Sequence, residues 1–465
     1  MVTQAADPTP SPAIDLDGFG ARLRGRLLRP GSERYEPHRQ VHNALIDRRP
    51  AAIVQVADVA DVVRTIDLAR SAGLPLAVRS GGHSIAGHGT VDGGIVVDLS
   101  LMRNLRIDGD GRRAIAQPGL TAGELTAALH EQELAVPLGD TTSVGLGGLT
   151  LGGGVGWLVR KHGLTIDSLE SVELVTADGS VVTADASTNR DLFWAVRGGG
   201  GNFGVVTRFE YRLHAVGTVL GGAVVIPASA AALRGVVSVA LDAPDELTVI
   251  AQVMHAPPAP FIPAEAIGRL VVVVMVVYAG HPDAGIQAVA PLRAVADPIA
   301  DIIRPMGYPD IYQLTEPATA PGPLAFRSTY LDSIDEGAAD AIIDGLRAAP
   351  GSTAMAQVRV IGGAAGRVPN DATAYAFRDR SLLLAVINPY RDAADAARQE
   401  SWLESCWAAI RPYGSGAMAS FLGDEGDERV REAYPGATYG RLAEIKRRYD
   451  PDNVFHLNQN IHPAS

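Results

Sequence analysis

A histidine set among glycines is the first feature of the sequence that could do chemistry. Residues 79–89 read Arg-Ser-Gly-Gly-His-Ser-Ile-Ala-Gly-His-Gly, which places His83 directly after two glycines. Because glycine has no Cβ, successive backbone N–H groups can converge on an anion and form a nest. A pyrophosphate suits such a nest, and His83 would then lie beside the molecule that carries the pyrophosphate.

Two other interpretations of this run stay open at this point. A tight turn that buries His83 explains a lone Gly-Gly-His without any ligand. A metal site made by His83 and His88 is the third interpretation, and it is disfavoured. The two histidines are five positions apart, which fits neither one face of a helix nor one face of a strand, and no carboxylate is close in the sequence.

A second glycine-rich run covers residues 144–157 and can be mistaken for a dinucleotide-binding fingerprint. Gly152 and Gly154 match the first two positions of GxGxxG, but the third position is Trp157. The run follows a glycine-rich loop rather than an apolar strand, so a Rossmann-type nicotinamide site is disfavoured. Two such loops, each next to α/β structure, better suit one long cofactor that is held from two sides.

Strands and helices in alternation must position these two loops. Residues 52–56 and 76–79 are predicted strands, and between them Asp58 can cap a helix that ends at Gly73. The strand at 76–79 runs directly into the first glycine run. Further predictions are a strand at 95–99, a capping box of Thr121 and Glu124, a helix from Trp157, a hairpin at 174–183 turning on Asp178-Gly179, and a half-buried strand at 205–213.

The composition of the sequence changes at about residue 214, after which there are no more glycine clusters. Apolar strand-like runs at 222–226, 247–253 and 270–278 alternate with helical runs such as 335–348. This pattern predicts a separate α+β domain that extends to about residue 417. A final helix at about 438–449 ends at Asp450-Pro451.

Composition narrows the class of protein. The chain has 465 residues, 47% hydrophobic and 20% charged, so it can bury a full core. Its formal net charge of −12 argues against nucleic acid and anionic membrane surfaces as partners. The single cysteine, Cys406, excludes an internal disulfide framework and any cysteine-built zinc site. We expect it to be a core residue.

No targeting or membrane segment is expected. The longest apolar run, 270–277, is too short to span a bilayer. The first residues have neither a basic n-region nor an apolar h-region, so we expect a cytoplasmic protein. Pro8, Pro10 and Pro12 mark a disordered leader.

Four motifs in order resemble a known family, the FAD-linked oxidases with a PCMH-type (vanillyl-alcohol-oxidase-like) FAD domain. Residues 78–84 resemble its flavin-attachment loop, 145–163 its second loop, and 197–206 its third. The segment 449–461, with Tyr-Asp-Pro-Asp-Asn-Val-Phe and Asn-Gln-Asn-Ile, resembles its C-terminal signature. The likeness is strongest to the berberine-bridge-enzyme-like branch, which includes bacterial oxidases of carbohydrates and secondary metabolites.

The resemblance implies an α+β fold of two domains. A PCMH-type FAD-binding domain of two α/β subdomains would be followed by a substrate domain, an antiparallel sheet covered by helices. We therefore divide the chain into a leader and N-terminal segment (1–39), the first part of the FAD domain (40–213), the substrate domain (214–417) and a segment that returns to the FAD domain (418–465).

The resemblance also implies that His83 carries FAD through an 8α-N-histidyl bond, which would make the isoalloxazine electron-poor and raise its redox potential. Many relatives form a second flavin bond from a cysteine. Thr141 stands at that position, so we predict a single covalent link, which slightly favours a small substrate. The other implied FAD contacts are Arg79, Ser80, Gly81, Gly82, Ser84, Gly87, His88, Thr141, Thr142, Gly145, Gly148, Gly152, Gly153, Gly156, Val206, Asn458 and Asn460.

Catalysis needs a group that accepts a proton from the O–H or N–H of the substrate. Plant relatives use a glutamate just before a Gly-Gly, but Arg359 occupies that position and stays protonated. Arg359 could hold an anionic or carbonyl group, or be ion-paired. Tyr375, on an expected pocket-facing strand, could accept a proton with a lowered pKa, orient the substrate or simply pack in the core. Tyr434 comes from the returning segment, as do Asn458 and Asn460, which suit flavin contacts better than bases.

These features predict an FAD-dependent oxidase that takes hydride from a C–H next to an OH or amine of a small molecule and passes electrons to O₂, giving H₂O₂. One alternative is a dehydrogenase of the same fold with another electron acceptor, acting on sugars or secondary metabolites. A nicotinamide-dependent reductase and a non-catalytic ligand-binding module are the other two. No pattern in the sequence indicates an oligomeric state.

Overall fold

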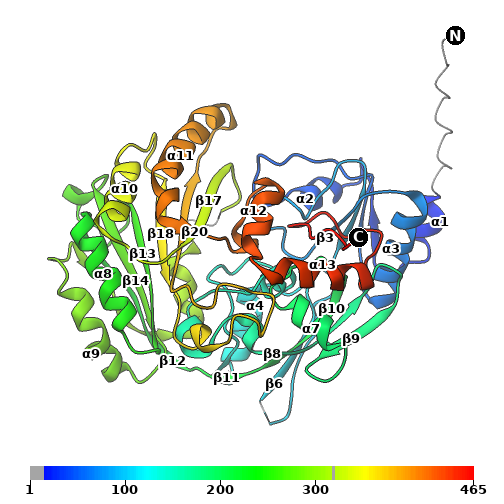
Figure 1. Ribbon diagram of the computed structural model, residues 1–465, viewed down its shortest axis with the longest axis horizontal. Helices are drawn as coiled ribbons and strands as arrows, with labels where there is room; N and C mark the ends of the chain where they lie inside the picture. Colours follow the sequence, from blue (N-terminus) through cyan, green and yellow to red (C-terminus); the bar gives the residue numbers. More distant parts are fainter. Residues whose placement is uncertain (1–14, 111, 317–319) are drawn as a thin grey trace.

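A computed structural model describes residues 15–110, 112–316 and 320–465. The prolines of the expected leader lie outside these residues. The chain forms two halves, and the C-terminal helices return to the first of them (Figure 1). The first half contains the predicted FAD domain and is called the flavin-side half below. The second half is built on one large sheet. Within the described part of the chain, no helix combines the length and apolar character that a bilayer span requires.

The first subdomain is a four-stranded sheet in the order β1-β2-β4-β3, with β2, β4 and β3 parallel and β1 antiparallel. The predicted helix is present: the Asp58 side chain accepts from the Asp61 N–H, and Gly73 ends the helix in the left-handed region at φ 63°. A domain start at residue 40 would leave β1 out of this sheet. The elements are α1 (Leu16–Gly20), β1 (Arg26–Leu28), α2 (Tyr35–Arg39), β2 (Ala52–Gln55), α3 (Val59–Ala72), β3 (Leu76–Arg79) and β4 (Ile95–Asp98).

The second subdomain is a five-stranded antiparallel sheet in the order β5-β6-β10-β8-β9. The predicted hairpin is its β8–β9 pair, and the capping box of Thr121 and Glu124 starts α4. A small β7–β11 pair lies beside it. The elements are β5 (Leu105–Ile107), β6 (Arg113–Ala116), α4 (Ala122–His130), β7 (Leu134–Ala135), β8 (Leu169–Val175), β9 (Val181–Asp185), α7 (Arg190–Val196), β10 (Val205–Arg212) and β11 (His214–Ala215).

The second glycine run is not a loop throughout, which corrects the expectation from sequence. It contains the helix α5 (Leu146–Leu151), and the helix expected from Trp157 is α6 (Val159–His162). Leu146, Leu149 and Leu151 are buried in the core of this subdomain. Their burial offsets the low helix propensity of the two glycines within α5.

The other half is a nine-stranded sheet in which all recorded pairs are antiparallel. Helices α8 to α11 cover its outer face (Figure 1). Because side chains alternate along a strand, Ala356, Val358 and Val360 pack under these helices, whereas Gln357 and Arg359 face the flavin-side half. The strands are β12 (Thr218–Pro227), β13 (Leu247–His255), β14 (Leu270–Tyr278), β15 (Ala300–Asp301), β16 (Arg304–Gly307), β17 (Leu324–Leu331), β18 (Met355–Val360), β19 (Leu382–Pro389) and β20 (Gly414–Ser415).

The remaining helices belong to the large-sheet half and to the C-terminal segment. Cys406 is free and buried on α11, as expected. Helices α12 and α13 lie back against the flavin-side half (Figure 1). The helices are α8 (Ala230–Asp242), α9 (Pro282–Arg293), α10 (Glu336–Arg347), α11 (Ala396–Ile410), α12 (Gly426–Ala433) and α13 (Ala437–Tyr449), with short 3₁₀ turns η1 (Thr165–Asp167), η2 (Ala264–Ala266), η3 (Tyr308–Leu314), η5 (Ala365–Arg367), η6 (Ala393–Asp395), η7 (Arg411–Tyr413) and η8 (Ala419–Phe421).

Candidate functional site

A cavity of about 430 Å³ lies where the two halves meet. Both glycine runs, the third loop and the C-terminal segment line it on the flavin side. Residues from β17, β18, β19 and the segment 418–422 line it on the side of the large sheet. A long cofactor held by several loops, with room for a second small molecule under the sheet, fits this arrangement.

The two glycine runs touch each other at the cavity. A Cβ at Gly81 would collide with the backbone nitrogen of Gly145, and a Cβ at Gly145 would collide with Ser80. The Ser80 hydroxyl donates to the Pro118 carbonyl at 2.6 Å and accepts from the Gly147 N–H at 3.1 Å. Only residues without a side chain allow this close approach, so the glycines at these two positions are required by packing.

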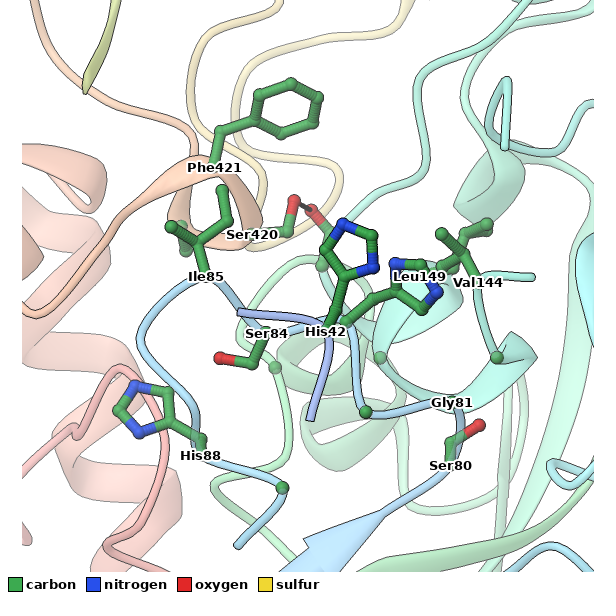
Figure 2. Close-up of a pocket in the computed structure, with 18 of the residues that line it drawn as sticks. His42, Ser80, Gly81, Ser84, Ile85, His88, Val144, Leu149, Ser420 and Phe421 are labelled. Carbon is green, nitrogen blue, oxygen red and sulfur yellow. Dashed lines mark hydrogen bonds between the residues drawn. The ribbon is translucent and has the colours of Figure 1, made fainter. Parts of the chain in front are cut away.

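His83 is held in a fixed orientation at the cavity wall. Its Nε2 lies 2.9 Å from the Ser143 hydroxyl, and its ring stacks on His42 with 4.3 Å between centroids. Burial, followed by His42 and Arg79, lowers the pKa of His83 to about 4. The imidazole is therefore neutral at neutral pH and keeps a nitrogen lone pair. Figure 2 shows Ser80, Ser84 and His88 along the loop beside His42.

Orphaned polar atoms in the cavity wall fit a polar cofactor such as FAD. His88 Nε2 and Asn458 Oδ1 are buried, and neither has a hydrogen-bond partner among the described residues. Buried polar atoms are nearly always hydrogen-bonded, and these two line the cavity, where a bound cofactor could supply the partners. Arg79 also lines the cavity and supplies positive charge beside the glycine amides. The donor set thus matches a molecule with a diphosphate and several hydroxyl groups.

The structure brings most of the predicted FAD contacts together. The cavity is lined by His83, Arg79, Ser80, Gly81, Gly82, Ser84, His88, Thr141, Gly145, Gly148, Gly152, Val206 and Asn458. Five predicted contacts do not line it: Gly87, Thr142, Gly153, Gly156 and Asn460. Two of them have contacts elsewhere: a Cβ at Gly156 would collide with the Leu138 carbonyl, and the Thr142 hydroxyl donates to Glu316 at 2.8 Å.

Several lining residues were missed by sequence reasoning. The glycine-rich third loop was recognised, but only Val206 was selected from it, although Gly199, Gly200 and Gly201 also line the cavity. Repeated glycine was the signal that could have found them. Asp140 and His42 carried no such signal, because neither belongs to a glycine-rich run.

Arg359 faces the cavity, but as one half of a buried ion pair. Its guanidinium donates to Asp140 and, at 2.7 Å, to the Gln357 side chain. The side chains of Arg359 and Asp140 are only 8% and 12% exposed. The guanidinium also lies 5.5 Å from the centre of the Phe421 ring. The ion-paired alternative is therefore the observed one, and Asp140 already neutralises the charge that was expected to hold a substrate anion.

The two tyrosines do not have the properties of proton acceptors. Tyr375 lies in irregular structure rather than on a strand, and it lines a small neighbouring cavity instead of the main one. Its hydroxyl lies 2.6 Å from that of Tyr330, and burial raises the pKa of Tyr375 to about 12. The alternative of a lowered pKa is not supported, because desolvation outweighs the lowering effects of the Tyr330 hydrogen bond and of the nearby Arg378. Tyr434 lines the main cavity, but its hydroxyl donates to the Gly198 carbonyl and burial raises its pKa as well.

A metal centre finds no support. No group of three or more His, Cys, Asp or Glu side chains suitable for a metal ion occurs among the residues that the structure describes. His83 engages Ser143 and stacks on His42 instead.

Comparison with known proteins identifies the class. Residues 50–185 match the FAD binding domain family, and residues 420–462 match the berberine and berberine-like family. The chain belongs to the FAD-linked oxidoreductases of the berberine-like branch and is an enzyme of that class, with FAD as its cofactor.

Three of the similar proteins and solved structures each cover nearly the whole chain. (R)-6-hydroxynicotine oxidase of Paenarthrobacter nicotinovorans is 30% identical over 465 residues, covering 95% of this chain and 97% of that one. The crystal structure of 6-hydroxy-D-nicotine oxidase from Arthrobacter nicotinovorans superposes with a TM-score of 0.84 at 27% identity, covering 95% and 98%. BBE-like 1 of Physcomitrella patens has the same fold, with a TM-score of 0.86 at 24% identity over 97% and 100%.

Proposed function

We propose that this enzyme is an oxidase that carries FAD through one covalent bond to His83. It removes hydride from a C–H next to an OH or amine of a small molecule, and O₂ accepts the electrons to give H₂O₂. The neutral, oriented imidazole of His83 in the wall of a cavity that fits FAD is the observation that supports this proposal most.

The proposed attachment uses His83 alone. Because Nε2 is engaged by the Ser143 hydroxyl, Nδ1 is the nitrogen that remains to form the bond. Thr141 lines the cavity at the position where many relatives have a cysteine, and a threonine hydroxyl is a far weaker nucleophile than a thiolate. Cys406, on α11, is not among the cavity-lining residues.

The substrate side of the cavity favours a small, largely apolar molecule. Phe326, Met355, Ile387 and Phe421 line it. Relatives whose names state sugar substrates, a chitooligosaccharide oxidase and a xylooligosaccharide oxidase, are 23% and 24% identical and share the fold. The relative named for 6-hydroxynicotine, a compact aromatic molecule, is the more similar in sequence. Apolar walls bind such a molecule better than a chain of hydroxyl groups.

In the proposed reaction the residues of this chain bind the cofactor, orient its ring system and shield the reacting carbon from water. The glycine amides and Arg79 would hold the diphosphate, His83 would fix the ring, and the Asn458 carbonyl oxygen would accept from a ring or ribityl donor. The side chains from the large sheet would exclude water from the reacting carbon. Bound FAD supplies the hydride acceptor.

The test is peroxide production by the purified holoenzyme. With 6-hydroxynicotine, aromatic alcohols and xylobiose as trial donors in air, at least one compound should yield H₂O₂ in proportion to the O₂ consumed. A flavin that these donors bleach, but that only an artificial dye reoxidises, would refute the oxidase and identify a dehydrogenase.

A further inference from the structure

One carboxylate faces the cavity among its described lining residues, and it belongs to Asp140. The sequence offered no base, because Arg359 replaces the glutamate expected on the sheet. In the structure the guanidinium of Arg359 reaches across the cavity to a carboxylate from the opposite half of the molecule. A carboxylate and a cation therefore both lie in the cavity wall, and the carboxylate comes from the loop of the flavin-side half that contains Asp140.

Asp140 occupies a position next to the flavin-binding loops. It directly precedes Thr141, which lines the cavity, and Ser143 in the same loop contacts His83 at 2.9 Å. The Asp140 backbone carbonyl accepts a hydrogen bond from the Thr315 hydroxyl, which fixes the loop against η3. Contacts at Asp140 and at Ser143 thus anchor the loop that carries the carboxylate.

The two carboxylate oxygens are not equally engaged. Oδ2 accepts from Arg359, whereas Oδ1 has only the Thr141 hydroxyl at 3.5 Å, a weak contact. A carboxylate oxygen can accept more than one hydrogen bond, so Oδ1 retains capacity for a donor from a bound molecule. Arg359 holds the carboxylate in one orientation without occupying Oδ1.

We propose that Asp140 is the proton acceptor of the reaction, with Arg359 as its positioning residue. This inference rests on the proposed function. The substrate O–H or N–H gives its proton to Asp140 Oδ1 while the adjacent carbon gives its hydrogen with two electrons to bound FAD, so a C=O or C=N bond forms. O₂ then takes the two electrons and two protons, leaving as H₂O₂, and one of those protons comes from Asp140.

The other titratable groups of the cavity wall suit this role less well. Tyr434 donates to a carbonyl and has a raised pKa, and His83 is the flavin anchor. His42 stacks on His83 and so lies at the attachment end of the ring system. His88 belongs to the glycine loop that would hold the diphosphate.

The experiment compares four holoenzymes by two readouts. They are the wild type, Asp140→Asn, the double variant Asp140→Asn with Arg359→Gln, and Asp245→Asn. Asp245 pairs with Arg367 at 2.5 Å outside the cavity and controls for the loss of any aspartate–arginine pair. The first readout is sulfite titration of the flavin absorbance, which needs no substrate. The second is the rate of anaerobic flavin bleaching by the donor that the wild type oxidises.

Sulfite is an anionic nucleophile that adds to the reactive centre of the oxidised flavin. If Asp140 lies beside that centre, Asp140→Asn should bind sulfite on the order of tenfold more tightly, because a nearby negative charge is removed. The double variant, which removes both charges, should bind sulfite as the wild type does. Unchanged sulfite affinity in Asp140→Asn would show that the carboxylate is remote from the reaction and would overturn the proposal.

The bleaching rate separates proton transfer from structure. Removal of a general base should slow bleaching by roughly 100-fold or more. The double variant should stay slow, since restored charge balance does not restore the base. Recovery of bleaching in the double variant would mean that Asp140 only balances Arg359, and the proposal would fail. If the wild-type enzyme lacks acid-stable flavin, or if no donor bleaches its flavin, the proposed function fails. The sulfite affinity of any flavin that the protein retains still tests whether Asp140 lies beside the flavin.

Discussion

Lys446 and Asp450 form a buried ion pair, with 2.5 Å between Nζ and Oδ2. Neither side chain is exposed to solvent. Lys446 also donates to the carbonyls of Asn202 and Phe455, and the Asp450 carboxylate accepts from the N–H groups of Val454 and Phe455. One buried pair therefore ties α13, the third glycine loop and the C-terminal signature together.

Asp450→Asn should destabilise the protein by about 3–5 kcal/mol, because it leaves the Lys446 charge buried without a counter-ion. Urea unfolding of the holoenzyme, followed by flavin fluorescence, measures this. The control is Glu444→Gln, which breaks the exposed Arg447–Glu444 pair on the same helix and should change stability by less than about 1 kcal/mol. Equal stability of the two variants would contradict the assigned importance of the buried pair.

His42→Ala should slow the covalent attachment of FAD, because the stacked ring that fixes the plane of His83 is lost. His42→Phe keeps a flat ring and should attach FAD closer to the wild-type rate. The measurement is a time course of acid-stable flavin after FAD is added to apoprotein. A wild-type rate in His42→Ala would show that the stack has no part in orienting His83.

Tyr375→Phe should leave the rate of substrate oxidation within about twofold of the wild type, since its hydroxyl is outside the main cavity. It should lower stability by about 1–2 kcal/mol, because the buried Tyr330 hydroxyl loses its partner at 2.6 Å. Steady-state kinetics and thermal unfolding give the two numbers. A large loss of rate with unchanged stability would restore a catalytic role for Tyr375.

Acid should destabilise the fold through a second histidine pair. His162 and His214 stack at 4.1 Å between centroids, and burial, aided by neighbouring charges, lowers their pKa values to about 3 and about 4. The unfolded chain takes up these protons first, so their stability contribution is complete above about pH 6.5 and is lost as the pH falls toward 4.

Between pH 7 and pH 5 the expected loss is about 1 kcal/mol for each histidine, after allowance for solvent screening. His162→Gln should flatten this part of the stability–pH curve, whereas His281→Gln, at an exposed site, should not. Thermal unfolding at pH 7 and pH 5 measures this change in stability. An equal loss of stability between the two pH values in the wild type and in His162→Gln would contradict the role assigned to His162.

Local signals made much of the fold predictable. Asp58, Gly73 and the Thr121 capping box mark helix ends through backbone chemistry that depends only on near neighbours. The glycine runs located the cofactor loops for the same reason, because glycine is required wherever two backbones meet.

What the sequence could not reveal depends on tertiary contacts. Asp140 and Arg359 are 219 positions apart, and neither residue type indicates the other. Helix α5 was taken for a loop because glycine lowers helix propensity, and buried leucines override that preference. The alternatives for Tyr375, a lowered pKa among them, could not be separated from the sequence, because its contact with Tyr330 joins residues 45 positions apart.

The central claim is that His83 alone carries the flavin. Intact mass and the absorption spectrum of acid-precipitated protein test it most directly, on the wild type, His83→Ala and Thr141→Ala. We predict one FAD added to the chain mass and a yellow precipitate for the wild type and Thr141→Ala, and a colourless chain of unmodified mass for His83→Ala. A wild-type mass equal to that of the bare chain after incubation with FAD, or loss of flavin in Thr141→Ala with retention in His83→Ala, would contradict the account.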